Sequence, residues 1–67
     1  MRINVNGEER ETEAGTVAAL LAFLGIEPVR VAVEVNMDII PKGEYGSTPL
    51  KEGDAVEIVQ FVGGGRF

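Results

Sequence analysis

The stretch Thr16–Gly25, TVAALLAFLG, decides the fold class because it carries the apolar period of a helix. Thr16 is suited to accept a hydrogen bond from the first helical turn, and Gly25 can take the left-handed conformation that ends a helix. Four apolar residues recur at i, i+3, i+4 and i+7, on one stripe that would pack over a sheet: Val17, Leu20, Leu21 and Leu24. We therefore predict one helix over 16–24.

On both sides of this helix the pattern changes to the alternation of strands. Asn6-Gly7 favours a two-residue hairpin turn, since both residues tolerate positive φ. Val31, Val33 and Val35 alternate with more polar residues, as in a strand buried on one face. The predicted strands are 3–6, 8–12, 31–35, 39–40 and 55–62. This order predicts a two-layer α+β domain, with the helix across one face of a mixed sheet and the first and last strands near its centre.

Two further segments have simple structural interpretations. The region 42–49 is rich in Gly, Ser, Thr and Pro, so we expect a loop or short helical turn held by Tyr45. The second strand is mostly charged, which is typical of a sheet edge. Its acidic residues alternate between the two faces, so we expect a solvated edge and no metal site at Glu8, Glu9, Glu11 and Glu13.

Composition excludes several function classes. With 67 residues the chain is one small domain, and a deep catalytic cavity is not expected. It has no Cys and no His, so thiolate or histidine catalysis and zinc-thiolate binding are excluded. The net charge of −5 argues against nucleic acid and favours a partner with a basic docking face. No stretch is long and apolar enough to cross a bilayer, and we expect a cytoplasmic protein without a cofactor.

The C-terminal segment is unusual, because the last strand runs directly into Gly63-Gly64-Gly65 before Arg66-Phe67. We expect residues 1–62 to form the domain and residues 63–67 a flexible tail. Glycine-rich ends are often simply frayed. Without Cβ atoms, however, such a segment can also thread extended through a narrow channel and present a backbone carboxyl group to a reagent.

The outward positions of the last strand have two interpretations. Val56 and Ile58 would point to one face, and Val59 and Phe61 to the other. Val59 and Phe61 would either be buried on the second sheet face or form, with Val62, an apolar patch that docks a partner beside the tail.

Three motifs together resemble the ThiS family, the sulfur carriers of thiamine biosynthesis. They are the opening of the helix at 15–17, VAVEVNMDIIP at 31–41 and EIVQFVGGG at 57–65. The resemblance implies a ubiquitin-like β-grasp fold. It also implies that an E1-like, ThiF-like adenylyltransferase activates the terminal glycine, that a sulfur donor protein supplies sulfur, and that a ThiG-like thiazole synthase receives the thiocarboxylate. The chain would then be a cosubstrate, with no catalytic residues of its own.

Family members usually finish at the glycine, whereas this sequence continues through Arg66-Phe67. We expect a protease to remove these residues and Gly65 to carry the sulfur, with Gly64 as the alternative. Related alternatives are carriers for molybdopterin, tungstopterin or cysteine biosynthesis. An alternative of another class is a β-grasp interaction module with an inert tail.

Overall fold

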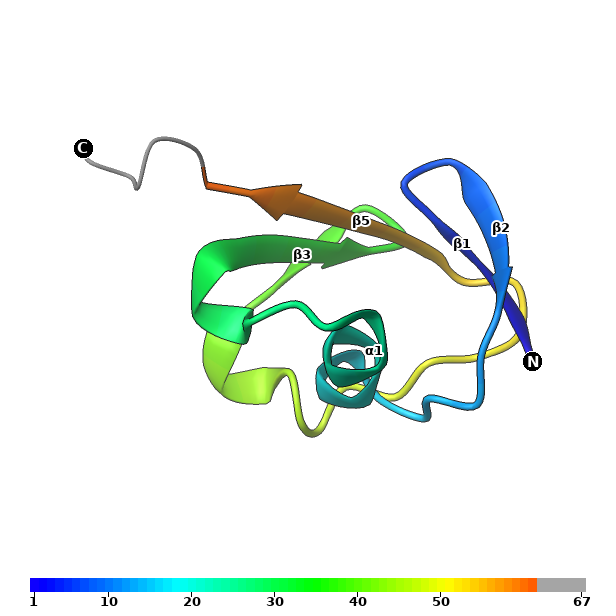
Figure 1. The fold of residues 1–67 in the computed structure, drawn as a ribbon, viewed down its shortest axis with the longest axis horizontal. Coiled ribbons are helices and arrows are strands. Elements are labelled where there is room, and N and C mark those ends of the chain that lie inside the picture. Colours follow the sequence, from blue (N-terminus) through cyan, green and yellow to red (C-terminus); the bar gives the residue numbers. More distant parts are fainter. Residues whose placement is uncertain (62–67) are drawn as a thin grey trace.

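The computed structural model describes residues 1–61 and shows one helix packed across a five-stranded sheet (Figure 1). Residues 62–67 lie outside the described part of the chain. Short 3₁₀ helices span Pro28–Arg30 and Lys42–Glu44. The main elements are β1 (Arg2–Val5), β2 (Glu8–Glu11), α1 (Val17–Leu24), β3 (Val31–Val35), β4 (Asp38–Ile40) and β5 (Ala55–Gln60).

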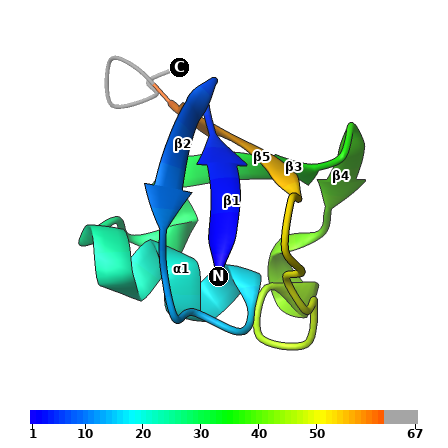
Figure 2. The same cartoon turned by 90° about the vertical axis from the view of Figure 1, so that its right-hand side faces the viewer.

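The strands lie in the order β2-β1-β5-β3-β4, which Figure 2 shows side by side. β1 and β5 are parallel, and the other neighbours are antiparallel. The prediction of a mixed sheet with the first and last strands near its centre is confirmed, because β5 is the central strand and β1 lies beside it. β2 forms an edge, as predicted, and every residue in it is exposed. The predicted α+β class is therefore confirmed, in the β-grasp arrangement.

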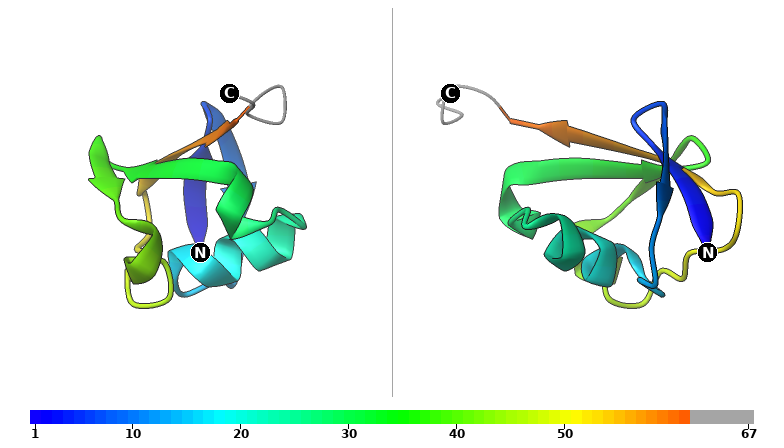
Figure 3. Two further views of the ribbon diagram at one scale, coloured as in Figure 1. Left: turned by 90° about the vertical axis from the view of Figure 1, so that its left-hand side faces the viewer. Right: turned by 45° about the vertical axis from the view of Figure 1, so that its right-hand side comes forward.

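The ends of α1 are set by the residues that the sequence indicated. The Thr16 hydroxyl oxygen accepts a hydrogen bond from the Ala19 N–H at 3.1 Å. Gly25 has φ 75° and donates its N–H to the Ala22 carbonyl at 3.1 Å. These caps form hydrogen bonds with backbone N–H and carbonyl groups at the helix ends that have no partner within the helix. Figure 3 shows that α1 lies across one face of the sheet only.

The core lies between α1 and the sheet and is built from alternating strand residues and the helix stripe. The Tyr45 hydroxyl donates a hydrogen bond to the Val31 carbonyl at 3.3 Å, which ties the 42–49 connection to β3 as expected. No helix within residues 1–61 has the length and apolar character to cross a membrane. The most deeply buried side chains are Ile3, Val17, Leu20, Leu21, Val31, Val33 and Val56.

The β1–β2 turn also secures β5. Asn6 and Gly7 have φ of 51° and 87°, which confirms the predicted positive-φ turn. The Asn6 side chain then pairs with β5 as a strand residue would: its Oδ1 accepts from the Ile58 N–H at 2.7 Å and its Nδ2 donates to the Ile58 carbonyl at 3.0 Å. β5 is thereby held beyond the last backbone pair with β1.

Candidate functional site

The C-terminal end of β5 is the candidate site, because it leads directly into the glycine segment. Val56 and Ile58 are buried against the core, whereas Val59 and Phe61 are 57% and 52% exposed. Burial of Val59 and Phe61 on the second sheet face, one of the two interpretations of the sequence, is therefore wrong. No helix covers that face within residues 1–61 (Figure 3). Phe61 donates its N–H to the Arg30 carbonyl at 3.0 Å, so backbone pairing with the segment before β3 continues past the end of β5.

Strand register places other side chains on the same face as Val59. Ala32 is directly opposite Val59, and Glu34 is directly opposite both Glu57 and Ile39. We define the sheet-face patch by its apolar members Ala32, Ile39, Val59 and Phe61.

Two carboxylates lie beside the sheet-face patch. Glu34 and Glu57 face each other across β3 and β5. Like charges directly opposite in a sheet repel each other, so a cationic group of a partner would reduce the repulsion between these two carboxylates. The face thus combines exposed apolar groups with a negative charge.

Lys42 is a residue of this region that sequence reasoning missed. Its Nζ lies 5.1 Å from the centroid of the Phe61 ring and 5.8 Å from that of Tyr45. It also donates hydrogen bonds to the carbonyls of Pro28, at 3.1 Å, and Val31. A cation over an aromatic ring is attracted by the ring's negative face, so Lys42 helps to orient Phe61. No pattern in the sequence relates residues 42 and 61.

The remaining predicted site residues cannot be placed. Val62, expected in the docking patch, and Gly63, Gly64 and Gly65, expected to thread into a partner, lie outside the described residues. Arg66 and Phe67 do as well. Their roles stay predictions.

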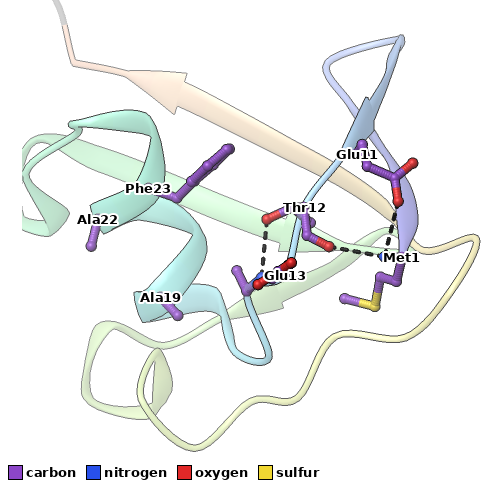
Figure 4. Close-up of a pocket in the computed structure, with 8 residues that line it drawn as sticks. Met1, Glu11, Thr12, Glu13, Ala19, Ala22 and Phe23 are labelled. Atoms are coloured by element: carbon purple, nitrogen blue, oxygen red, sulfur yellow. Dashed lines mark hydrogen bonds and ion pairs between the residues drawn. The ribbon is translucent and has the colours of Figure 1, made fainter.

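The surface hollows lined by residues 1–61 include two that share no residue with the sheet-face patch. The larger, of about 660 Å³, lies beside the outer side of α1 (Figure 4). The smaller, of about 290 Å³, is lined by Val5, Asn6, Arg10, Leu24, Ile26, Ile58 and Gln60. Neither contains a paired acid and base arranged for catalysis. Among the described residues, no group of three or more carboxylates is placed to bind a metal ion.

One carboxylate at the larger hollow has a shifted pKa. The Met1 ammonium lies 3.2 Å from Glu11 Oε2 and donates a hydrogen bond to it, and the Arg2 Nε lies 3.4 Å from Oε1. The ammonium, followed by Arg2, lowers the pKa of Glu11 below its ordinary value. Because Glu11 is exposed, this pair is a solvated contact at the sheet edge and no sign of a catalytic acid.

Comparison with known proteins gives consistent matches over nearly the whole chain. The sequence model of the ThiS family matches residues 3–65. The sulfur carrier protein ThiS of Bacillus subtilis is 38% identical over 65 residues, which cover 97% of this chain and 98% of that protein. The crystal structure of the thiamine biosynthesis protein ThiS from Geobacter metallireducens superposes with a TM-score of 0.83 at 33% identity, covering 97% of this chain and 100% of that one.

A second kind of relative is much longer. A thiazole synthase of Paramagnetospirillum magneticum is 48% identical over 66 residues, or 97% of this chain. The chain spans only about a fifth of the length of that protein and of a similar thiazole synthase from Magnetococcus marinus. In both proteins a segment similar to this chain is part of a longer polypeptide.

Proposed function

The chain belongs to the ThiS family, and we propose that it carries sulfur for thiamine biosynthesis on the carboxyl group of a glycine in its tail. The observation that carries the proposal is the family match, which includes the three glycines after β5 and stops at residue 65. The ThiS proteins of Bacillus subtilis and Thermus thermophilus match over nearly their full lengths, which favours thiamine over the molybdopterin, tungstopterin and cysteine alternatives.

The proposed chemistry requires activation by a partner. A carboxylate is a poor electrophile, so its oxygen first attacks the α-phosphorus of ATP and pyrophosphate leaves. The terminal sulfur of a persulfide on the donor protein then attacks the carbonyl carbon of the acyl-adenylate, and AMP leaves. A thiol then attacks the inner sulfur of the resulting acyl disulfide, which forms a disulfide with the donor and releases the thiocarboxylate. An E1-like adenylyltransferase and a sulfur donor protein would supply the catalytic groups, since this chain has neither Cys nor His. The chain then acts as a carrier and not as a catalyst.

Gly65 is the proposed attachment point, with Gly64 as the alternative. Gly63, Gly64 and Gly65 have no side chains that could obstruct a narrow channel. In this proposal a protease removes Arg66-Phe67 first, because the Phe67 ring would not fit a channel shaped for glycine. The thiocarboxylate is then delivered to thiazole synthase, in agreement with the relatives of that name.

The sheet-face patch is proposed to dock the E1-like adenylyltransferase, together with Val62. It lies beside the exit of the tail, so docking there would bring the glycines to the enzyme. Its exposed Val59 and Phe61 offer apolar contact, and the facing carboxylates Glu34 and Glu57 would attract a basic group.

The carrier function is tested by forming the thiocarboxylate. We expect a form ending at Gly65, incubated with the cognate E1-like enzyme, ATP and a sulfur source, to gain the mass difference between sulfur and oxygen. Mass spectrometry of the intact chain measures this change, and omission of ATP is the control. An unchanged mass, in a reaction where an established carrier is converted, would instead favour an interaction module with an inert tail.

Docking is tested by Phe61→Asp. Because Phe61 is an exposed aromatic residue beside the tail, we expect this change to weaken binding to the E1-like enzyme about 30-fold, or about 2 kcal/mol, as for an interface hot spot. Calorimetric titration measures the affinity, and thermal unfolding should be nearly unchanged. Met37→Asp, at an exposed turn residue outside the patch, is the matched control. Equal effects of the two substitutions would contradict docking at Phe61.

A further inference from the structure

α1 is unusual for a helix on the surface of a small domain, because it carries no charged residue. Val17, Leu20 and Leu21 face the core. Its outer side is also apolar, with Ala19, Ala22 and Phe23 exposed at i, i+3 and i+4. A surface helix normally presents polar residues to water, and a helix that is apolar on all sides is normally buried. The outer side of α1 therefore has the composition of a covered surface.

This side of α1 adjoins the larger hollow, which we call the helix-face hollow. Phe23 is 61% exposed and projects outward from the helix (Figure 4). The helix-face hollow has a volume of about 660 Å³, enough for one or two partner side chains. It is lined by Met1, Glu11, Thr12, Glu13, Ala14, Ala19, Ala22 and Phe23.

The charge beside the helix-face hollow indicates what can cover it. Glu13 forms no ion pair within residues 1–61, whereas Glu11 is paired with the Met1 ammonium and Arg2. The segment 8–13 carries four glutamates and a single arginine. A second copy of the chain would bring its own glutamates and its own net charge of −5 to the contact. Charge complementarity therefore favours a basic partner over self-association.

We propose that the helix-face hollow docks a partner segment that inserts an apolar side chain against Phe23 and directs a Lys or Arg toward Glu13. The hollow lies beside α1, which covers one face of the sheet, whereas the sheet-face patch lies on the other (Figure 3). A second protein can thus bind while the sheet-face patch is occupied. This inference does not depend on the tail chemistry.

The test uses a defined probe, an amphipathic peptide with Leu at i, i+3, i+4 and i+7 and Lys elsewhere. In a titration of the ¹⁵N-labelled chain followed by NMR, we expect the largest amide shifts over 11–14 and 18–23. A peptide with Glu in place of Lys should bind at least about tenfold more weakly. Shifts centred on β5 and β3, or equal binding of both peptides, would overturn the proposal.

Variants separate this site from general attraction between opposite charges. Phe23→Ser should weaken binding of the Lys peptide about tenfold or more, and Ala22→Arg should do so by filling the hollow and repelling the peptide. Met37→Ser, at an exposed apolar residue outside both the hollow and the sheet-face patch, should have no effect. Amide spectra of the free variants establish that each remains folded.

A matched pair of substitutions tests how far charge contributes to binding of the Lys peptide. Glu13→Gln and Asp38→Asn each remove one exposed carboxylate, at the hollow and on the edge strand β4 respectively. We expect a several-fold loss of affinity for the first and little change for the second. Equal losses would show non-specific attraction and overturn the proposal. So would sedimentation velocity that shows a dimer abolished by Phe23→Ser, since a second copy would then be the occupant.

Discussion

A form of the chain made to end at Gly65 should be adenylated at least about 100-fold faster than one ending at Phe67. Adenylation requires the terminal carboxylate to reach the α-phosphorus of ATP in a defined orientation. In the proposed mechanism, two added residues would move the carboxylate away from that point, and the Phe67 ring would obstruct a channel that admits glycine. ATP–pyrophosphate exchange with the cognate E1-like enzyme measures the difference.

The comparison includes a form ending at Gly64. Exchange by that form alone would keep the carrier function but move the sulfur-bearing position from Gly65 to Gly64. Mass spectrometry of the Phe67 form after the assay shows whether Arg66-Phe67 are still attached. Equal exchange by the intact Phe67 form would refute the requirement for their removal.

Leu21→Ala should lower the free energy of unfolding by about 2–5 kcal/mol. Leu21 is 0% exposed and belongs to the core between α1 and the sheet, so its truncation leaves a cavity that so small a domain cannot easily close. Domains of this kind have only about 5–15 kcal/mol of stability, so the variant should be close to unfolding. Urea denaturation followed by circular dichroism measures the loss.

Phe23→Ala on the same helix is the matched control. Its side chain is exposed, so we expect a change within about 0.5 kcal/mol. A loss from Leu21→Ala no larger than that from Phe23→Ala would mean that the helix stripe does not supply the main packing of the core.

Local features of this fold could be predicted from the sequence because each depends on neighbouring residues. Thr16 and Gly25 mark the ends of α1, since a cap bonds to backbone only a few residues away. Asn6-Gly7 predicts the hairpin turn through its tolerance of positive φ. The alternation in 31–35 separates buried valines from their neighbours, because strand side chains point to opposite faces in turn.

The candidate site was predictable only in part. The sequence showed that Val59 and Phe61 share a face, but whether that face is covered depends on where other elements pack. Only the tertiary structure shows that Lys42 lies over Phe61. It alone also shows that the charge-free outer side of α1 lies beside Glu13. Each of these two arrangements joins residues whose separation along the chain matches neither the helix period nor the strand period.

The sequence by itself thus determined the type and limits of most elements, whereas the tertiary structure decided their pairing. The parallel contact of β1 with β5, and the bond from Asn6 to Ile58, join residues about 50 positions apart. The alternation of apolar and polar residues predicts which side of a strand is apolar, but it does not predict which strand lies beside it. That choice depends on burying all the apolar faces together under one helix, which is a property of the assembled core and not of any segment.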